Sequence, residues 1–187
     1  MLPLLQNPAF QKRAMPLSIE AWHQMVAKGL APKRAELIRG VIVEKMSKSI
    51  LHTKLAGRLL AVFLNSCAGY WVRKEEPITL KDSEPEPDVS IVEGSETDYE
   101  NHPTKARLVV EVAVTTLSED REMADLYAEG GIEEYWIVNA PERAIEVFRQ
   151  PVGGHYSVVS RISSGTVSTC GLDVDVAALF AGLPSVE

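Results

Sequence analysis

The feature that most constrains this chain is the segment Leu108–Ala113, which reads Leu-Val-Val-Glu-Val-Ala. Successive side chains of a β-strand point to opposite faces of the sheet, and here both faces are apolar except at Glu111. Strands of this composition are covered on both faces, as in α/β proteins whose helices pack on two sides of a sheet. The segment therefore predicts an α/β fold with a buried central strand.

Glu111 interrupts this apolar run, and Asp88 stands at the start of a second short apolar strand, Asp88–Val92. An ionised carboxylate inside a protein is costly unless it is paired, hydrogen-bonded or bound to a metal. Two acids at the same end of neighbouring strands repel each other, and a divalent cation would relieve that repulsion. The alternative is that each acid pairs with a core arginine, such as Arg107 or Arg121.

The remaining periodicity predicts one domain over residues 1–187. Ser18 is expected to cap a helix that ends at Gly29, and apolar residues at helical spacing predict a longer helix over Ser49–Cys67. Tyr127 and Trp136 are interpreted as core residues whose polar tips each need one partner. Further strands are expected at Ala35–Ile38, Val41–Lys45, Tyr70–Val72, Ile78–Leu80, Glu134–Val138, Ala144–Phe148 and Tyr156–Ile162, with helices from Ser118 or Asp120 to Gly130 and over Val174–Phe180.

Composition excludes several classes of protein. No apolar run approaches the roughly 18 residues of a membrane span, and the first 16 residues lack the layout of a signal peptide. The two cysteines, Cys67 and Cys170, do not have the spacing of a zinc site or a disulfide scaffold. A reduced, cytoplasmic location is the expectation.

Charge is unevenly distributed along the chain. Residues 1–81 hold 13 Lys and Arg against 5 Asp and Glu, whereas residues 82–187 hold 6 against 21. This asymmetry fits a polyanion-binding face, a dimer in which opposite charges meet, or simply solvated faces of uneven charge. On the long helix, Lys48, His52, Lys54 and Arg58 lie off the apolar stripe, either to contact nucleic-acid phosphates or as an ordinary solvated face.

Several short motifs occur in a recognisable order. They are Glu36-Leu37-Ile38, Glu44-Lys45-Met46-Ser47, His52, Pro87-Asp88, Glu111-Val112, Asp120 and Glu134-Tyr135-Trp136-Ile137-Val138-Asn139. Over about residues 17 to 150, this order resembles the Uma-two-type restriction endonucleases of the PD-(D/E)XK nuclease superfamily.

The resemblance implies a restriction-endonuclease-like core, a mixed β-sheet flanked by α-helices. It also implies hydrolysis of DNA phosphodiester bonds with Mg²⁺, or Mn²⁺, held by Asp88, Glu111 and the backbone carbonyl of Val112. Glu36 would be a more distant ligand or base, or else a surface residue of its strand. Because cutting two strands commonly takes two active sites, a homodimer is expected, with the strand Ala144–Phe148 as one possible interface.

One part of the family pattern is missing. Relatives carry a lysine on the helix after the second acid, but here that position holds Met123 or Ala124. The nearer position used in the superfamily, two residues after Glu111, is Ala113. The sequence contains no lysine after Lys105.

A cation at that position normally orients the attacking water and stabilises charge in the transition state. Arg121 could replace it as a catalytic residue, Lys45 or Lys48 could enter from elsewhere in the fold, or a second metal ion could serve instead. The alternative is a catalytically inactive protein of the nuclease fold that binds nucleic acid or a protein partner.

Overall fold

The computed structural model describes residues 7–65 and 69–185. The chain forms two compact units, residues 1–45 with 81–84, and residues 46–80 with 85–187. Each unit has an apolar core of its own. This division does not test the expectation of a single domain over residues 1–187, which stays a prediction.

The first unit contains helix α2 and a β-hairpin. Its elements are α1 (Pro8–Gln11), α2 (Ile19–Ala27), β1 (Ala35–Ile38) and β2 (Val41–Glu44). Ser18 caps α2 by accepting the N–H of Ala21, and Gly29 ends the helix with a φ of 67°. Trp22 packs with Leu37 in the small core. The helix and both strands of the hairpin are as predicted.

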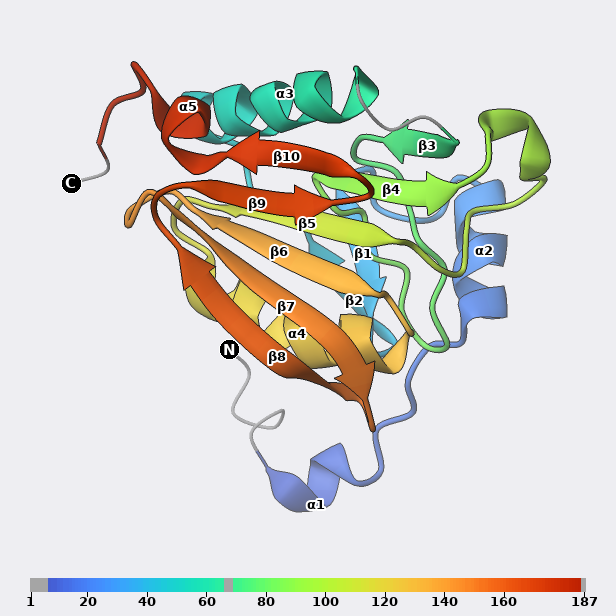
Figure 1. Ribbon diagram of the computed structural model, residues 1–187. Helices are drawn as coiled ribbons and strands as arrows, with labels where there is room; N and C mark the ends of the chain where they lie inside the picture. The colour runs from blue at the N-terminus through green and yellow to red at the C-terminus, as the bar shows by residue number, and fades with distance from the viewer. Residues whose placement is uncertain (1–6, 66–68, 186–187) are drawn as a thin grey trace. The chain divides into compact units, whose positions relative to one another are not determined.

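The second unit is built on a six-stranded mixed sheet in the order β3-β4-β5-β6-β7-β8 (Figure 1). Its strands are β3 (Tyr70–Arg73), β4 (Val89–Glu93), β5 (Leu108–Ala113), β6 (Glu134–Asn139), β7 (Ala144–Val152) and β8 (His155–Ile162). Neighbouring strands are antiparallel except β5 and β6, which are parallel. The predicted fold class, a mixed sheet flanked by helices, is confirmed.

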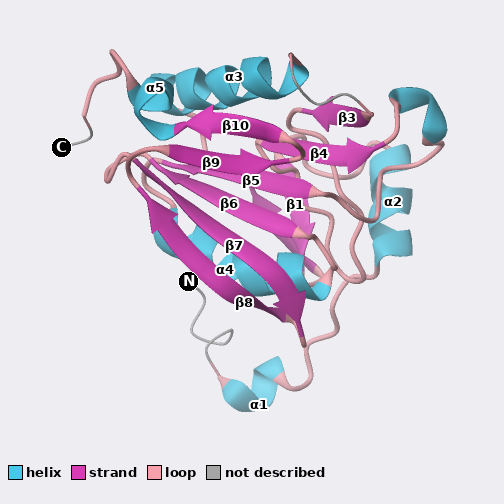
Figure 2. Cartoon of the chain, viewed as in Figure 1, coloured by secondary structure: helices cyan, strands magenta, loops and turns pink. Residues whose placement is uncertain are grey.

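Helices cover both faces of this sheet (Figure 2). One face carries α3 (Ile50–Leu64), α5 (Val176–Phe180) and the hairpin of β9 (Thr166–Thr169) and β10 (Leu172–Asp175), and the other carries α4 (Leu117–Glu129). A 3-10 turn, η2 (Glu96–Asp98), follows β4. The buried side chains of α3 are Leu55, Ala56, Leu59 and Phe63, as its apolar stripe predicts; the expected end at Cys67 lies outside the described residues.

Strand β5 presents different chemistry to the two layers. Leu108, Val110 and Val112 belong to the core shared with α3, so the alternation of a strand directs Glu111 to the opposite face, where α4 lies. The Tyr127 hydroxyl of α4 donates to Glu111. The apolar run thus belongs to a strand covered on both faces, as predicted.

Two expectations about elements and one about an interface are wrong. Ile78–Leu80 is not a strand: the N–H of Ile78 donates to the carbonyl of Pro85, and Thr79 pairs its N–H with Pro103, so the segment forms no ladder. Ile78 is nevertheless fully buried, which explains its apolar pattern.

The C-terminal helix begins at Val176 rather than Val174, because Leu172–Asp175 forms β10 and pairs with β9. Ala144–Phe148 is the buried start of β7, bonded to β6 on one side and β8 on the other, so it offers no open edge as an interface. Within residues 7–65 and 69–185, no helix has both the length and the apolarity that crossing a membrane requires.

Candidate active site

Asp88 and Glu111 meet because β4 and β5 are antiparallel neighbours. Val89 pairs with Val110, and continuing this register by one residue places Asp88 opposite Glu111. The N–H of Asp88 donates to Glu111 Oε2 at 3.3 Å. Asp88 is only 4% exposed. The structure therefore brings together the two acids that the sequence singles out.

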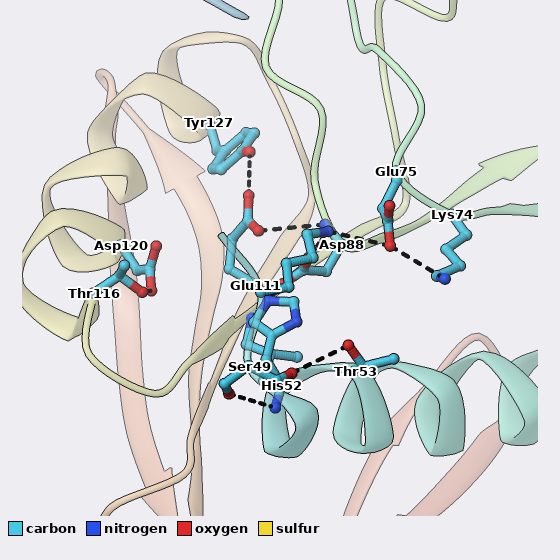
Figure 3. Close-up of polar contacts among 12 residues, drawn as sticks. Ser49, His52, Thr53, Lys74, Glu75, Asp88, Glu111, Thr116, Asp120 and Tyr127 are labelled. Atoms are coloured by element: carbon cyan, nitrogen blue, oxygen red, sulfur yellow. Dashed lines mark hydrogen bonds and ion pairs between the residues drawn. The ribbon is translucent and has the colours of Figure 1, made fainter. Parts of the chain in front are cut away.

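Two basic side chains from the start of α3 contact Asp88. Lys48 Nζ lies 2.8 Å from Asp88 Oδ1, and His52 Nε2 lies 2.8 Å from Oδ2. The N–H of Val112 also donates to Oδ2, at 2.8 Å. Ser49 caps the helix by accepting the N–H of His52 at 3.1 Å, which fixes the first turn from which His52 extends (Figure 3).

These contacts determine the ionisation of Asp88. Burial raises the pKa of its carboxyl, but the hydrogen bonds and positive charges of His52 and Lys48 outweigh burial and hold that pKa below its ordinary value. Burial likewise lowers the pKa of Lys48, and its contact with Asp88 more than offsets that effect. Asp88 is therefore an ionised carboxylate at neutral pH, and Lys48 is an ammonium.

Glu111 is oriented from the opposite layer. Its Oε1 accepts the Tyr127 hydroxyl at 2.9 Å, while Oε2 faces the N–H of Asp88 (Figure 3). The Tyr127 ring packs on Tyr135, with centroids 4.8 Å apart. The interpretation of Tyr127 as a core residue whose polar tip finds a partner is confirmed, and the partner of its hydroxyl is a candidate site residue.

Asp120 is a third acid close to this pair. It lies in the first turn of α4, where Thr116 Oγ1 donates to its Oδ2 at 2.7 Å. Burial raises the pKa of Asp120 to about 6; Thr116 opposes the shift, and the negative charges of Asp88 and Glu119 add to it. The sequence shows Asp120 among the family motifs without a role. Its place just after β5 is the signal that would have drawn attention to it, because a first-turn acid there lies near the end of that strand.

Arg121 has a carboxylate partner of its own, and Glu36 belongs to the first unit. Arg121 makes a two-bond ion pair with Glu146, Nε to Oε2 at 2.8 Å and Nη2 to Oε1 at 2.6 Å. Glu36 lies on β1, in the first unit. Their catalytic roles stay predictions.

The four basic residues of the predicted nucleic-acid face are divided among different tasks. Lys48 and His52 contact Asp88, and Arg58 donates to the carbonyls of Leu179 and Ala181 at 2.7 and 2.8 Å. Lys54 is exposed on α3. Nucleic-acid binding by the four residues stays a prediction.

The donor set at Asp88 and Glu111 fits a hard divalent cation. Carboxylate oxygens are the ligands that Mg²⁺ prefers, and Mg²⁺ keeps several waters, so it needs few protein ligands. Among the described residues no group of three or more His, Cys, Asp and Glu is arranged to hold a metal. His52 Nδ1 is buried and has no hydrogen-bond partner among the described residues. A water or a bound group would therefore be needed to satisfy it.

Comparison with known proteins identifies the family. The family model Uma2, described as "Putative restriction endonuclease", matches residues 20–176. The chain belongs to the Uma2 family. The resemblance inferred from the motifs is thereby confirmed, and the match extends past residue 150 to the first residue of α5.

Among solved structures, the Uma2 chain is similar to a putative nuclease belonging to DUF820 from Anabaena variabilis. The TM-score is 0.73 and the identity 14%, with 89% of this chain and 98% of that chain covered. At this identity the likeness shows the fold alone. A search of curated proteins found no match.

Proposed function

We propose that this Uma2 protein is a Mg²⁺-dependent endonuclease that hydrolyses phosphodiester bonds in DNA, with Asp88 and Glu111 as metal ligands. The observation that carries the proposal is the convergence of these two carboxylates beside the ammonium of Lys48, in a chain of a restriction-endonuclease family. Acids that bind a cation and a lysine that contacts phosphate are the parts that metal-assisted hydrolysis needs.

Asp88, Glu111 and the carbonyl of Val112 would hold the ion. In an extended strand the N–H and carbonyl of one residue face the same neighbour, and the N–H of Val112 points at Asp88. When bound, Mg²⁺, or Mn²⁺ in its place, would polarise the phosphate and lower the pKa of a bound water. Tyr127 keeps Glu111 oriented by donating to its second oxygen.

Lys48 is inferred to supply the cation that relatives carry on the helix after the second acid. Its ammonium is at the acid pair, whereas the guanidinium of Arg121 is bound to Glu146. A lysine so placed can donate to a phosphate oxygen as negative charge develops in the transition state. His52 holds the second oxygen of Asp88 and thereby fixes the plane of that carboxylate.

Cleavage of supercoiled plasmid DNA with Mg²⁺ or Mn²⁺ tests the proposal, comparing the wild type with Asp88→Asn. Glu146→Gln is a matched control, because Glu146 is 5% exposed and is likewise held by a cationic side chain. We expect ion-dependent cleavage by the wild type and the control, and a loss of at least about 100-fold in Asp88→Asn. Equal cleavage by wild type and Asp88→Asn would reveal a contaminating nuclease and reject the assignment.

The second candidate function is a catalytically inactive nuclease fold that binds nucleic acid or a protein partner. It is favoured by Asp88 already holding Lys48, His52 and a backbone N–H, and by Met123 and Ala124 at the family lysine position. Salt-sensitive DNA binding without cleavage in either ion would support this candidate.

A double-strand cut commonly takes two active sites, so the endonuclease proposal includes a homodimer. Sedimentation of the protein, alone and with a short DNA duplex, measures its oligomeric state. A monomer that nicks only one strand would retain hydrolysis but remove the dimer from the proposal.

A further inference from the structure

A third carboxylate, outside the acid pair, contacts Lys48. Glu75 Oε1 lies 3.2 Å from Lys48 Nζ, and the same nitrogen lies 2.8 Å from Asp88 Oδ1. An ammonium has three N–H donors, so it can serve both carboxylates at once. Lys48 is therefore shared between an acid assigned to the metal and an acid with no role in the proposed function (Figure 3 shows Glu75 beside Asp88).

The turn that carries Glu75 has a conformation that needs support. Glu75 has a φ of 53°, in the left-handed region, which is strained for an L-residue other than glycine. Its N–H lies 3.1 Å from the carbonyl of Pro87 and 3.3 Å from that of Asp88. The strained residue is thus attached through its backbone to the Pro87-Asp88 segment.

A buried arginine holds the other side of this turn. Arg73 is 1% exposed, and it donates from Nε to Glu76 Oε2 at 3.0 Å and from Nη1 to the carbonyl of Pro77 at 2.9 Å. Its guanidinium also lies over the ring of Trp71, 4.8 Å from the centroid. The position of Glu75 is therefore set from two sides, by its backbone bonds to Pro87 and Asp88 and by the contacts of Arg73 with the following residues. A solvated surface acid would not need such support.

The charge of Glu75 is maintained by lysines. Burial raises the pKa of its carboxyl, but hydrogen bonds from Lys48 and Lys74 outweigh burial and hold the pKa below its ordinary value. Lys74 Nζ lies 3.2 Å from Glu75 Oε1. Glu75 therefore remains an ionised acceptor for Lys48 at neutral pH.

We propose that Glu75 is a positioning residue that keeps the Lys48 ammonium beside the acid pair when a divalent cation takes Asp88. A cation held by Asp88 would compete with Lys48 for that carboxylate and would repel its charge, so Lys48 would need a second acceptor to stay within reach of a phosphate. Glu75 is that acceptor, already in contact and anchored to the backbone of Asp88. This inference rests on the proposed function, because it assigns a role around the same metal ligands.

The test follows the ammonium itself, by ¹H–¹⁵N NMR of lysine side chains during titration with Mg²⁺, in wild type, Glu75→Gln and Lys74→Met. The Lys48 signal is assigned by its absence from Lys48→Arg. Lys74→Met is the matched control, since Lys74 contacts the same oxygen of Glu75. We expect a protected Lys48 signal that persists at saturating Mg²⁺ in the wild type and control but disappears by solvent exchange in Glu75→Gln.

Glu75→Asn provides a second variant, because asparagine tolerates the left-handed backbone better than most residues and still removes the charge. It is expected to behave as Glu75→Gln does. A Lys48 signal that persists with Mg²⁺ in both variants overturns the inference and leaves the proposed function standing. Loss of the signal in both variants, in a protein that binds Mg²⁺ but never cleaves DNA, supports the inference and removes only the hydrolysis. Absence of any Mg²⁺ binding by calorimetry overturns both.

Discussion

Asp88 and Glu146 are two buried carboxylates of the same sheet, and their surroundings differ. They are 4% and 5% exposed, and in each the pKa is held below its ordinary value. Glu146 accepts two bonds from the Arg121 guanidinium and one from the Asn139 amide. Asp88 instead meets an ammonium, an imidazole and a backbone N–H.

The partners determine what each acid can do. A planar guanidinium matches one carboxylate with two fixed bonds, so the Glu146 pair is complete in itself. An ammonium on a flexible stem can turn to another acceptor, and Lys48 already contacts Glu75 as well as Asp88. Burial of an acid therefore does not by itself make it a metal ligand; an acid whose partners can turn to other acceptors is the one that can take a cation.

The charges near Glu146 and near Asp88 also differ. The charges that act on Glu146 are those of arginines, which stabilise its ionised form. Asp88 has Glu111 opposite it, and its charge reaches Asp120, where it raises the pKa. An excess of acids in one place favours a bound cation.

The largest effect is expected from exchanging the cations of the two clusters for methionine. Lys48→Met should slow Mg²⁺-dependent cleavage by about 100- to 1,000-fold, as expected when one transition-state donor is lost. Arg121→Met should leave the rate of the folded enzyme within a few-fold, because Arg121 is bound away from the acid pair. Single-turnover cleavage with excess enzyme measures both.

The stability of Arg121→Met is a second measurement on the Glu146 pair. Arg121→Met removes both guanidinium hydrogen bonds from the buried Glu146 and leaves it the Asn139 amide and the more distant charge of Arg161, so urea unfolding should show a loss of about 1–2 kcal/mol. A large rate loss in Arg121→Met, with Lys48→Met unaffected, would reverse the assignment and restore Arg121 as the catalytic cation.

A smaller effect is expected on the free energy of unfolding, because Asp120 is buried close to other acids. The pKa of Asp120 in the folded protein is about 6, above the roughly 3.9 of an unfolded aspartate. Such an acid favours folding while it is protonated, and this contribution is lost as pH rises from about 4 to 6 and stays lost above. Asp120→Asn should therefore stabilise the protein by about 1–2 kcal/mol at pH 7.5.

Urea unfolding of wild type and Asp120→Asn at two pH values measures this difference. The gain should fall to about a third at a pH of about 4.5, where the folded wild type carries a protonated Asp120 while the unfolded chain is still mostly ionised there, and it should nearly vanish only below a pH of about 3.5. A gain of equal size at both pH values would mean that packing, not charge, separates the two proteins.

The central part of this arrangement was predictable from local patterns. Glu111 stands out because an acid inside an apolar strand is unusual. Asp88 stands out because it directly precedes a second apolar strand. Helix α3 was predictable because its apolar residues repeat at helical spacing. The β9–β10 hairpin was missed because it consists of two four-residue strands with polar alternate positions, a signal too short to distinguish from loop.

The partners of the acids were not predictable in the same way. Arg121, Lys45 and Lys48 were all reasonable replacements for the missing lysine, because the sequence does not show which cation reaches the acid pair. The choice depends on Glu146 of β7, which binds Arg121 of α4, and on the residues before α3 that direct Lys48 to Asp88. Glu75 could not be found either, because its φ of 53° and its bonds to Pro87 and Asp88 are properties of the folded backbone.

The smallest expected effect applies the same contrast to α3, where Arg58 is committed to the protein and Lys54 is exposed. If Lys54 contacts a phosphate, Lys54→Gln should lower the slope of log K against log salt by about 1 and weaken binding uniformly across DNA sequences. Arg58→Gln should instead leave the slope unchanged, because its donors already serve the carbonyls of Leu179 and Ala181. Fluorescence anisotropy of a labelled duplex with Ca²⁺, over a range of salt concentrations, measures both slopes without cleavage. An unchanged slope in Lys54→Gln would remove α3 from the DNA interface and confine its basic residues to the acid pair and the C-terminal helix.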